Sequence, residues 1–191
     1  MMKESIKLIG LAKARADNGF SQVGRTLDPA DPVDRVLMLL ASRAIATANA
    51  ILLLSLNNHA NEGLPLLRSL FEIAAHIRWI AAQDSTARAR EFLEEHRAPS
   101  WDAVWSGSRL KERMKVLGFG AALEDQVMVS CYDHVHGNAA GLPWGHVFEE
   151  NAHKGMSADD LLKTTAALME HVITALDSRW PGMFPAAARP K

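Results

Sequence analysis

The sequence has a single cysteine, Cys131, among its 191 residues. One cysteine cannot form an intrachain disulfide, and it cannot supply the thiolates of a cysteine-based zinc finger. The chain also has no excess of positive or negative charge. Its 21 Lys and Arg are balanced by 22 Asp and Glu, which gives a formal net charge of −1 at pH 7. The chain therefore has no overall basic field that would attract nucleic acid, although the balance leaves room for a local basic patch.

Long hydrophobic runs are absent as well. The longest is AILLLSL, residues 50–56, far shorter than the ~20 apolar residues that span a bilayer. No basic and apolar leader precedes the body of the chain, so we expect a cytoplasmic protein with no membrane partner. With 48 % hydrophobic and 23 % charged residues, the composition is that of a globular protein, and 191 residues suffice for one well-packed domain.

No segment alternates apolar and polar residues as a half-buried strand does. Two long stretches read as helices instead, the first over residues 33–58 and the second from NNHANEGLP to about Gln83. The sequence also predicts a short helix over 4–16, and an amphipathic helix that begins at a Ser157–Asp160 capping box. We expect an all-α, up-and-down antiparallel bundle with two long central helices. It would be a single domain over residues 1–191, with a core at about 33–178 and a loose tail at 179–191.

Polar side chains recur at steps of four in RSLFEIAAHIRWI, residues 68–80. Arg68, Glu72 and His76 share one sector of a helix whose opposite side carries Leu, Ile, Phe and Ala. One interpretation is a solvated face with an ordinary i,i+4 ion pair. The other is a cleft between the central helices, where Arg43 of the preceding helix faces the stripe and Arg68–Glu72 pairing offsets desolvation. The sequence leaves both open.

The motif YDHVHGN, residues 132–138, places Tyr132 and His136 one turn apart on a later helix. A hydrogen-bonded structural role is the simplest interpretation of such a histidine. A diiron bundle would need two Glu-x-x-His pairs and two further carboxylates. The nearest matches are HANE at 59–62 and EIAAH at 72–76, so we expect no metal and no other cofactor.

Together, LPLLRSLFEIAAHIRWI and YDHVHGN resemble a family of uncharacterised bacterial helical domains, with a Leu-Leu-Arg-Ser-x-x-Glu helix and a downstream Tyr followed by His-Gly. That family is similar to the HEPN superfamily, and the resemblance covers roughly residues 33–176. It implies a four- or five-helix bundle, often dimeric, that acts in toxin–antitoxin or antiphage systems as an RNase or as a nucleotide- or RNA-binding module. His136 matches the histidine of the HEPN catalytic motif, but Val129, Ser130 and Cys131 stand where its arginine belongs.

These observations predict a HEPN-like homodimeric bundle that binds a nucleotide, RNA or a small anionic ligand in bacterial defence or stress response. The expected ligand-binding residues are Arg43, Glu72, His76 and Tyr132. His136, with Arg68 as the cation, would form the catalytic pair if the protein cleaves RNA. Two alternatives stay open: an enzyme, either a metal-independent RNase or a metal-dependent hydrolase, and a structural or partner-binding bundle without a ligand.

Overall fold

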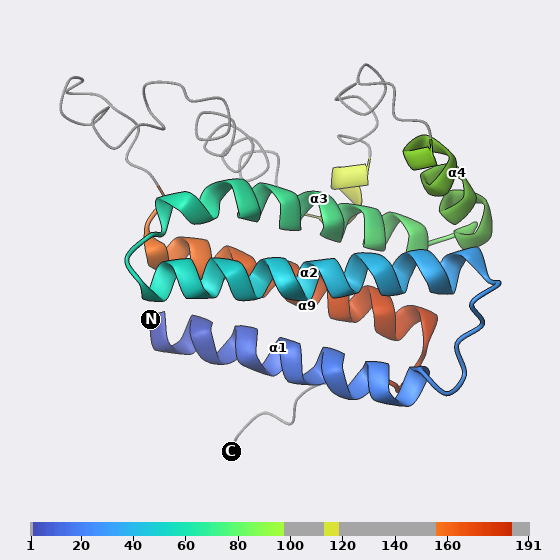
Figure 1. Ribbon diagram of the computed structural model, residues 1–191, viewed down its shortest axis with the longest axis horizontal. Helices are drawn as coiled ribbons and strands as arrows, with labels where there is room; N and C mark the ends of the chain where they lie inside the picture. Colours follow the sequence, from blue (N-terminus) through green and yellow to red (C-terminus); the bar gives the residue numbers. More distant parts are fainter. Residues whose placement is uncertain (1, 98–112, 119–155, 185–191) are drawn as a thin grey trace.

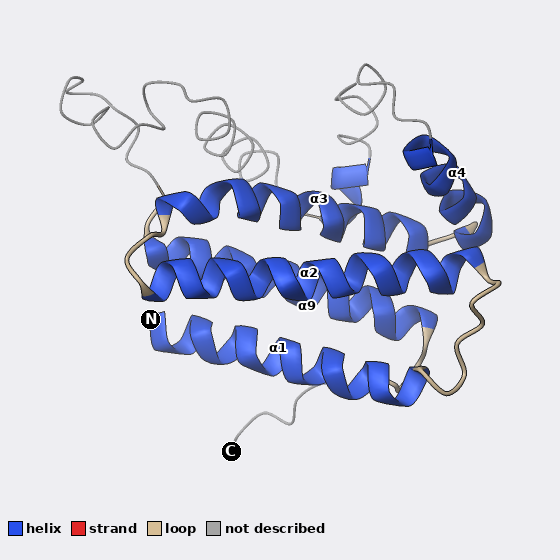
Figure 2. Cartoon of the chain, in the orientation of Figure 1, coloured by secondary structure: helices blue, strands red, loops and turns tan. Residues whose placement is uncertain are grey.

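The computed structural model describes residues 2–97, 113–118 and 156–184, and the structural statements below refer to these segments (Figure 1). Every regular element in them is helical, as the sequence predicts, and Figure 2 draws no strand in this part of the chain. In chain order the elements are α1 (Met2–Val23), α2 (Pro32–Leu56), the 3-10 helix η1 (Asn61–Gly63), α3 (Leu64–Ala81), α4 (Ser85–Arg97), the 3-10 helix η2 (Lys115–Leu117) and α9 (Ala158–Arg179).

The two central helices, α2 and α3, begin where the sequence supplies helix-starting signals. The Val33 backbone N–H donates to the Asp31 side chain at 2.8 Å, and Pro32 occupies the first turn, where a backbone N–H has no partner within the helix. Pro65 does the same in the first turn of α3. Between the helices, Asn58 adopts the left-handed conformation (φ 63°), which asparagine tolerates better than most residues. The chain reverses there, so that α2 and α3 pack side by side (Figure 1).

The hydrophobic core lies between α2, α3 and α9, and α1 packs mainly along α9. The axes of these four helices run roughly along one direction in Figure 1. Buried side chains cover most of the circumference of α3, with Leu67, Phe71 and Ile77 among them. The polar stripe of α3 is therefore confined to a narrow sector at the edge of the core.

The first helix is longer than the sequence predicts. The helix expected over residues 4–16 begins at Met2 and continues to Val23, through Gly19. The Phe184 ring packs so closely against Gly19 that an added Cβ would have no room. Ala12, Ala16 and Val23 are buried in the same core as α2 and α3, which means that the core begins well before residue 33.

The first residues of the expected loose tail also differ from the expectation. Phe184 is buried in the core, and its ring meets that of Phe20 edge-on, with 5.6 Å between the centroids. The backbone N–H groups of Gly182 and Phe184 donate to the Asp177 side chain. A buried aromatic ring outweighs the tendency of the neighbouring prolines to loosen the chain. The remainder of the expected tail, 185–191, lies outside the described residues.

Helix α2 is long and apolar enough, by length and composition, to cross a membrane, and it is the one helix of the described segments that meets this criterion. The core helix of a soluble protein passes the same test, so the finding does not settle where the protein resides. However, only 39 % of its most apolar window is buried within the chain. The outward half of α2 is therefore unusually apolar.

Candidate functional site

Arg68 and Glu72 of α3 form the ion pair that their spacing predicts. Arg68 Nε donates to Glu72 Oε1 at 3.0 Å, and the side chains are 12 % and 33 % exposed, respectively. The pair is thus neither an ordinary solvated surface pair nor a fully enclosed one. Solvent screens such a partly buried pair less than it screens exposed charges.

His76 lies one turn further along α3 and makes a polar contact with Arg113. Its Nδ1 is 3.2 Å from Arg113 Nη1. Because a guanidinium has donors and no acceptor, Nδ1 must accept this hydrogen bond. A neutral His76 consequently carries its proton on Nε2. The Phe92 ring of α4 packs edge-on against the imidazole, with 5.1 Å between the centroids, and limits its rotation.

Arg113, whose role its sequence neighbours do not reveal, joins α3 to α4. Its side chain is 5 % exposed, and Nη2 lies 2.9 Å from Glu95 Oε2 and 3.4 Å from Glu91 Oε1. Its guanidinium carbon also lies 4.0 Å from the centroid of the Trp79 ring, in a cation–π contact. A buried guanidinium needs such partners to offset the loss of water. We therefore define the Arg113 cluster as Arg113 with His76, Trp79, Glu91 and Glu95.

Two further arginines hold the C-terminal half of α3. Arg88 Nη1 donates to the Trp79 carbonyl oxygen at 2.7 Å, and its guanidinium also lies over the Trp79 ring. Arg78 Nη2 donates to the Val116 carbonyl oxygen at 3.2 Å. Arg88 lies in the arginine-rich segment TARAREF and Arg113 in the basic segment RLKERM, and these segments were the sequence signal for their contacts.

The other predicted site residues do not join this group in the described structure. Arg43 is exposed on α2, so it is not enclosed between α2 and α3 as the cleft interpretation expected. Its role in ligand binding stays a prediction. Tyr132 and His136 lie outside the described residues, and their roles also stay predictions.

The HANE motif forms an exposed pair in the structure, with 3.9 Å between His59 Nδ1 and Glu62 Oε2. Within residues 2–97, 113–118 and 156–184, no three His, Cys, Asp or Glu side chains gather as a metal site requires. Within the described part of the chain, Glu72 and His76 therefore do not belong to a group that could hold a metal ion.

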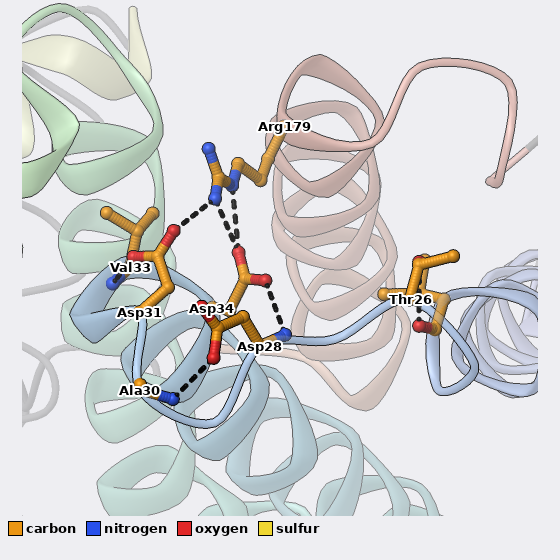
Figure 3. A network of polar contacts seen from close by, with 8 residues as sticks. Thr26, Asp28, Ala30, Asp31, Val33, Asp34 and Arg179 are labelled. Atoms are coloured by element: carbon orange, nitrogen blue, oxygen red, sulfur yellow. Dashed lines mark hydrogen bonds and ion pairs between the residues drawn. The ribbon is translucent and has the colours of Figure 1, made fainter.

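A separate polar network ties the start of α2 to the end of α9 (Figure 3). Arg179 Nη2 lies 2.7 Å from Asp31 Oδ2 and 2.6 Å from Asp34 Oδ1. Burial by itself lowers the pKa of Arg179, but the hydrogen bond and charge of Asp34, and then those of Asp31, outweigh it and raise the pKa. Aspartates at a helix N-terminus and an arginine at a C-terminus also complement the two helix dipoles. The network fixes the relative position of α2 and α9.

Residues 34–115 match the model of a family described as "Family of unknown function (DUF5677)". This segment is less than half of the chain, and it contains α3, α4 and the whole Arg113 cluster but ends before Tyr132 and His136. No curated protein and no solved structure matches the chain. The chain is thus similar, over its central helices, to an uncharacterised family, and nothing in these comparisons points to the HEPN superfamily.

Proposed function

We propose that the protein is a cytoplasmic, HEPN-like, up-and-down antiparallel bundle that binds a nucleotide, RNA or another small anionic ligand through the polar face of α3. The observation that carries this proposal is the position of Arg68. Its side chain is 12 % exposed and pairs with the carboxylate of Glu72, whose side chain is 33 % exposed. The pair stands at the edge of a hydrophobic core. A setting in bacterial defence or stress response follows from the sequence resemblance alone.

The chemistry of Arg68 suits an anionic group. Glu72 accepts from Nε, and this contact orients the plane of the guanidinium. An oriented guanidinium recognises phosphate or carboxylate oxygens through paired N–H donors. Because the side chain is already ordered, a ligand loses less conformational entropy on binding to it.

Glu72 and His76 narrow the class of ligand. A carboxylate next to the cation repels a bare anion, but it can accept a hydrogen bond from a sugar hydroxyl or a nucleobase amino group. His76 lies on the same sector of α3, one turn from Glu72, and its Nδ1 contacts Arg113. We therefore favour a nucleotide or RNA over inorganic phosphate.

A structural or partner-binding bundle is the second candidate, and the Arg113 cluster favours it. The positive charge of Arg113 faces two carboxylates and an aromatic ring of the same chain. Such a cluster holds α3 and α4 together without any ligand. Under this alternative, the Arg68–Glu72 pair serves packing as well.

The proposal is tested by titrating the protein with ATP, GTP, AMP, inorganic phosphate and a fluorescent mixed-sequence RNA at low salt, where phosphate contacts are strongest. We expect Arg68→Ala to weaken binding by at least about tenfold, the usual effect of losing a charge-assisted hydrogen bond. Arg25→Ala is the matched control, because Arg25 is exposed on the α1–α2 connection. No binding by the wild type at low salt, or equal losses in both variants, would overturn the proposal.

The enzyme alternative is tested by measuring RNA cleavage in the same samples. RNA cleavage by the wild type, without added metal and lost in a folded His136→Ala variant, would support the RNase interpretation. Cleavage that persists in His136→Ala would remove His136 from the catalytic assignment. Activity that appears only with an added divalent metal would favour the hydrolase alternative.

A further inference from the structure

Helix α4 lies over the C-terminal part of the polar face of α3. The Phe92 ring of α4 packs edge-on against His76. Glu91 and Glu95, one turn apart on α4, both accept hydrogen bonds from the guanidinium of Arg113. Arg113 also contacts His76 Nδ1 at 3.2 Å, and its side chain is 5 % exposed. The arginine is therefore enclosed between α4 and the face of α3 that carries the proposed ligand site.

Apolar packing holds α4 less firmly than it holds the central helices. Among the described side chains of α4, Ala89 is fully buried, whereas Phe92 and Leu93 are partly buried. Helix α3, by comparison, has nine buried residues. The contacts that tie α4 to α3 include polar ones, such as the hydrogen bond from Arg88 to the Trp79 carbonyl oxygen. Segments with few buried apolar side chains open at a lower free-energy cost than the core does.

The connection between α3 and α4 has the form of a hinge. It consists of residues 82–84, which are all exposed. Asp84 adopts the left-handed conformation, with φ at 57°, which aspartate tolerates better than most residues. Hinges are commonly a few residues at the ends of elements that absorb a change in backbone angles. Rotation there would move α4 while α3 stays packed in the core.

The carboxylates of α4 occupy donors that an arginine also uses to bind phosphate. Arg113 Nη2 lies 3.1 Å and 2.9 Å from the two carboxylate oxygens of Glu95, and 3.4 Å from Glu91 Oε1. Carboxylate and phosphate oxygens fit the same fork of guanidinium N–H groups. A phosphate and Glu95 would therefore compete for Arg113.

We propose that α4 is an autoinhibitory lid, in which Glu91 and Glu95 occupy Arg113 in place of a phosphate group of the ligand. This inference rests on the proposed function, because it concerns access to the same face of α3. Arg68 lies about 12 Å along the helix axis from His76, the contact of Arg113, at 1.5 Å per residue. A nucleotide or RNA carries several phosphates, so one ligand could engage both arginines once α4 has moved.

The lid makes a prediction about the direction of change. The closed form pairs the charge of Arg113 within the chain, and the apparent affinity for a ligand falls with the fraction of molecules that are open. A substitution that weakens the hold of α4 on Arg113 should thus strengthen binding while it lowers stability. A purely structural contact would lower stability without strengthening binding.

The first test measures the affinity of the full chain for ATP and for the fluorescent mixed-sequence RNA at low salt. Glu95→Gln should bind at least about fivefold more tightly than the wild type, because a neutral amide holds a guanidinium about half as strongly as a carboxylate does. Glu91→Gln should give a smaller gain, since Glu91 is 50 % exposed and lies farther from Nη2. Glu94→Gln is the matched control, which removes the same charge from an exposed position of the same helix.

The outcomes separate the lid from the proposed function. Circular dichroism checks the folding of each variant, and Glu91→Gln decides the test if Glu95→Gln does not fold. Affinities equal to or weaker than that of the wild type, or an equal gain in Glu94→Gln, contradict the lid. The proposed function then still stands if Arg68→Ala weakens binding. If neither the wild type nor the α4 variants bind, the proposed function and the lid fall together.

The second test follows the movement of α4 by hydrogen exchange and mass spectrometry. Saturating ATP or RNA should speed the exchange of backbone amides in α4, because the bound ligand holds the lid open. The amides of α9, which does not contact the Arg113 cluster through any of the hydrogen bonds described above, should exchange at an unchanged rate. Unchanged or slower exchange in α4 with ligand bound shows that α4 does not open, and the lid is then wrong whatever the affinities.

Discussion

Helices α2 and α3 are both long and apolar in sequence, yet the chain uses them in different ways. Helix α3 buries nearly its whole apolar circumference and keeps its polar residues at the edge of the core. Helix α2 buries one side and leaves leucines exposed on the other. The comparison shows that apolar composition predicts a helix without fixing how much of that helix its own chain covers. It also predicts that charges around α3 stabilise the fold, whereas the exposed leucines of α2 do not.

The largest effect is expected for Arg113→Ala. The substitution leaves Glu95 without its buried cation and removes the cation–π contact with Trp79. Removing one member of a buried charge pair should lower the unfolding free energy by ~3 kcal/mol, which is the lower end of the usual range. Urea denaturation followed by circular dichroism measures the change. Arg90→Ala, on an exposed position of α4, should stay within about 0.5 kcal/mol of wild type.

Arg179→Ala should cost less, about 2 kcal/mol, because the Arg179 side chain is 32 % exposed while Asp34 is 7 % exposed. The pKa of Arg179 is raised in the folded protein, so its stabilisation is complete below the ordinary arginine pKa and is lost only as pH rises beyond it. The arginine itself therefore contributes no pH dependence near neutrality. Unfolding free energies at pH 7 and pH 9 test this, and a difference between wild type and Arg179→Ala that changes across this interval contradicts it.

Glu72→Ala should cost about 1 kcal/mol, because Glu72 is 33 % exposed and water replaces part of its contact with Arg68. The result sharpens the comparison, since it measures how much of the polar face of α3 serves stability. A melting temperature within one degree of wild type would assign the pair to binding alone. A loss as large as that of Arg113→Ala would show that the pair is a structural tie.

The smallest effect is expected for Leu39→Ser on the outward face of α2. Measured at a concentration where the protein is monomeric, the unfolding free energy should change by no more than about 0.5 kcal/mol, because the side chain is already 64 % exposed. A loss above about 2 kcal/mol in the monomer would break the comparison, since it would mean that α2 is covered by its own chain.

The helical class and the two central helices follow from the sequence because they depend on local signals. Apolar periodicity, Pro32 and the NNHANEGLP turn set the limits of α2 and α3 to within a few residues. The Arg68–Glu72 pair is equally local, since its members are four residues apart on one helix.

Contacts between distant parts of the chain could not be predicted in this way. Gly19 continues α1 because Phe184 packs against it, and no signal near Gly19 reveals that partner. Arg113 reads as one charge in a basic segment until α4 and Trp79 are placed around it. The exposure of Arg43 likewise depends on which side of α2 faces the core.

The packing of α1 on α9, closed by Phe184 against Gly19, has a consequence for synthesis on the ribosome. Helix α1 leaves the exit tunnel before its main partner, α9, has been translated. Until then α1 exposes the apolar side that α9 will cover. Exposed apolar surface of this kind favours chaperone binding or aggregation. We expect ribosome-bound chains that end before residue 158 to be cleaved by protease within α1, and full-length released chains to resist. Equal protection of α1 in both would show that α1 docks before α9 is made.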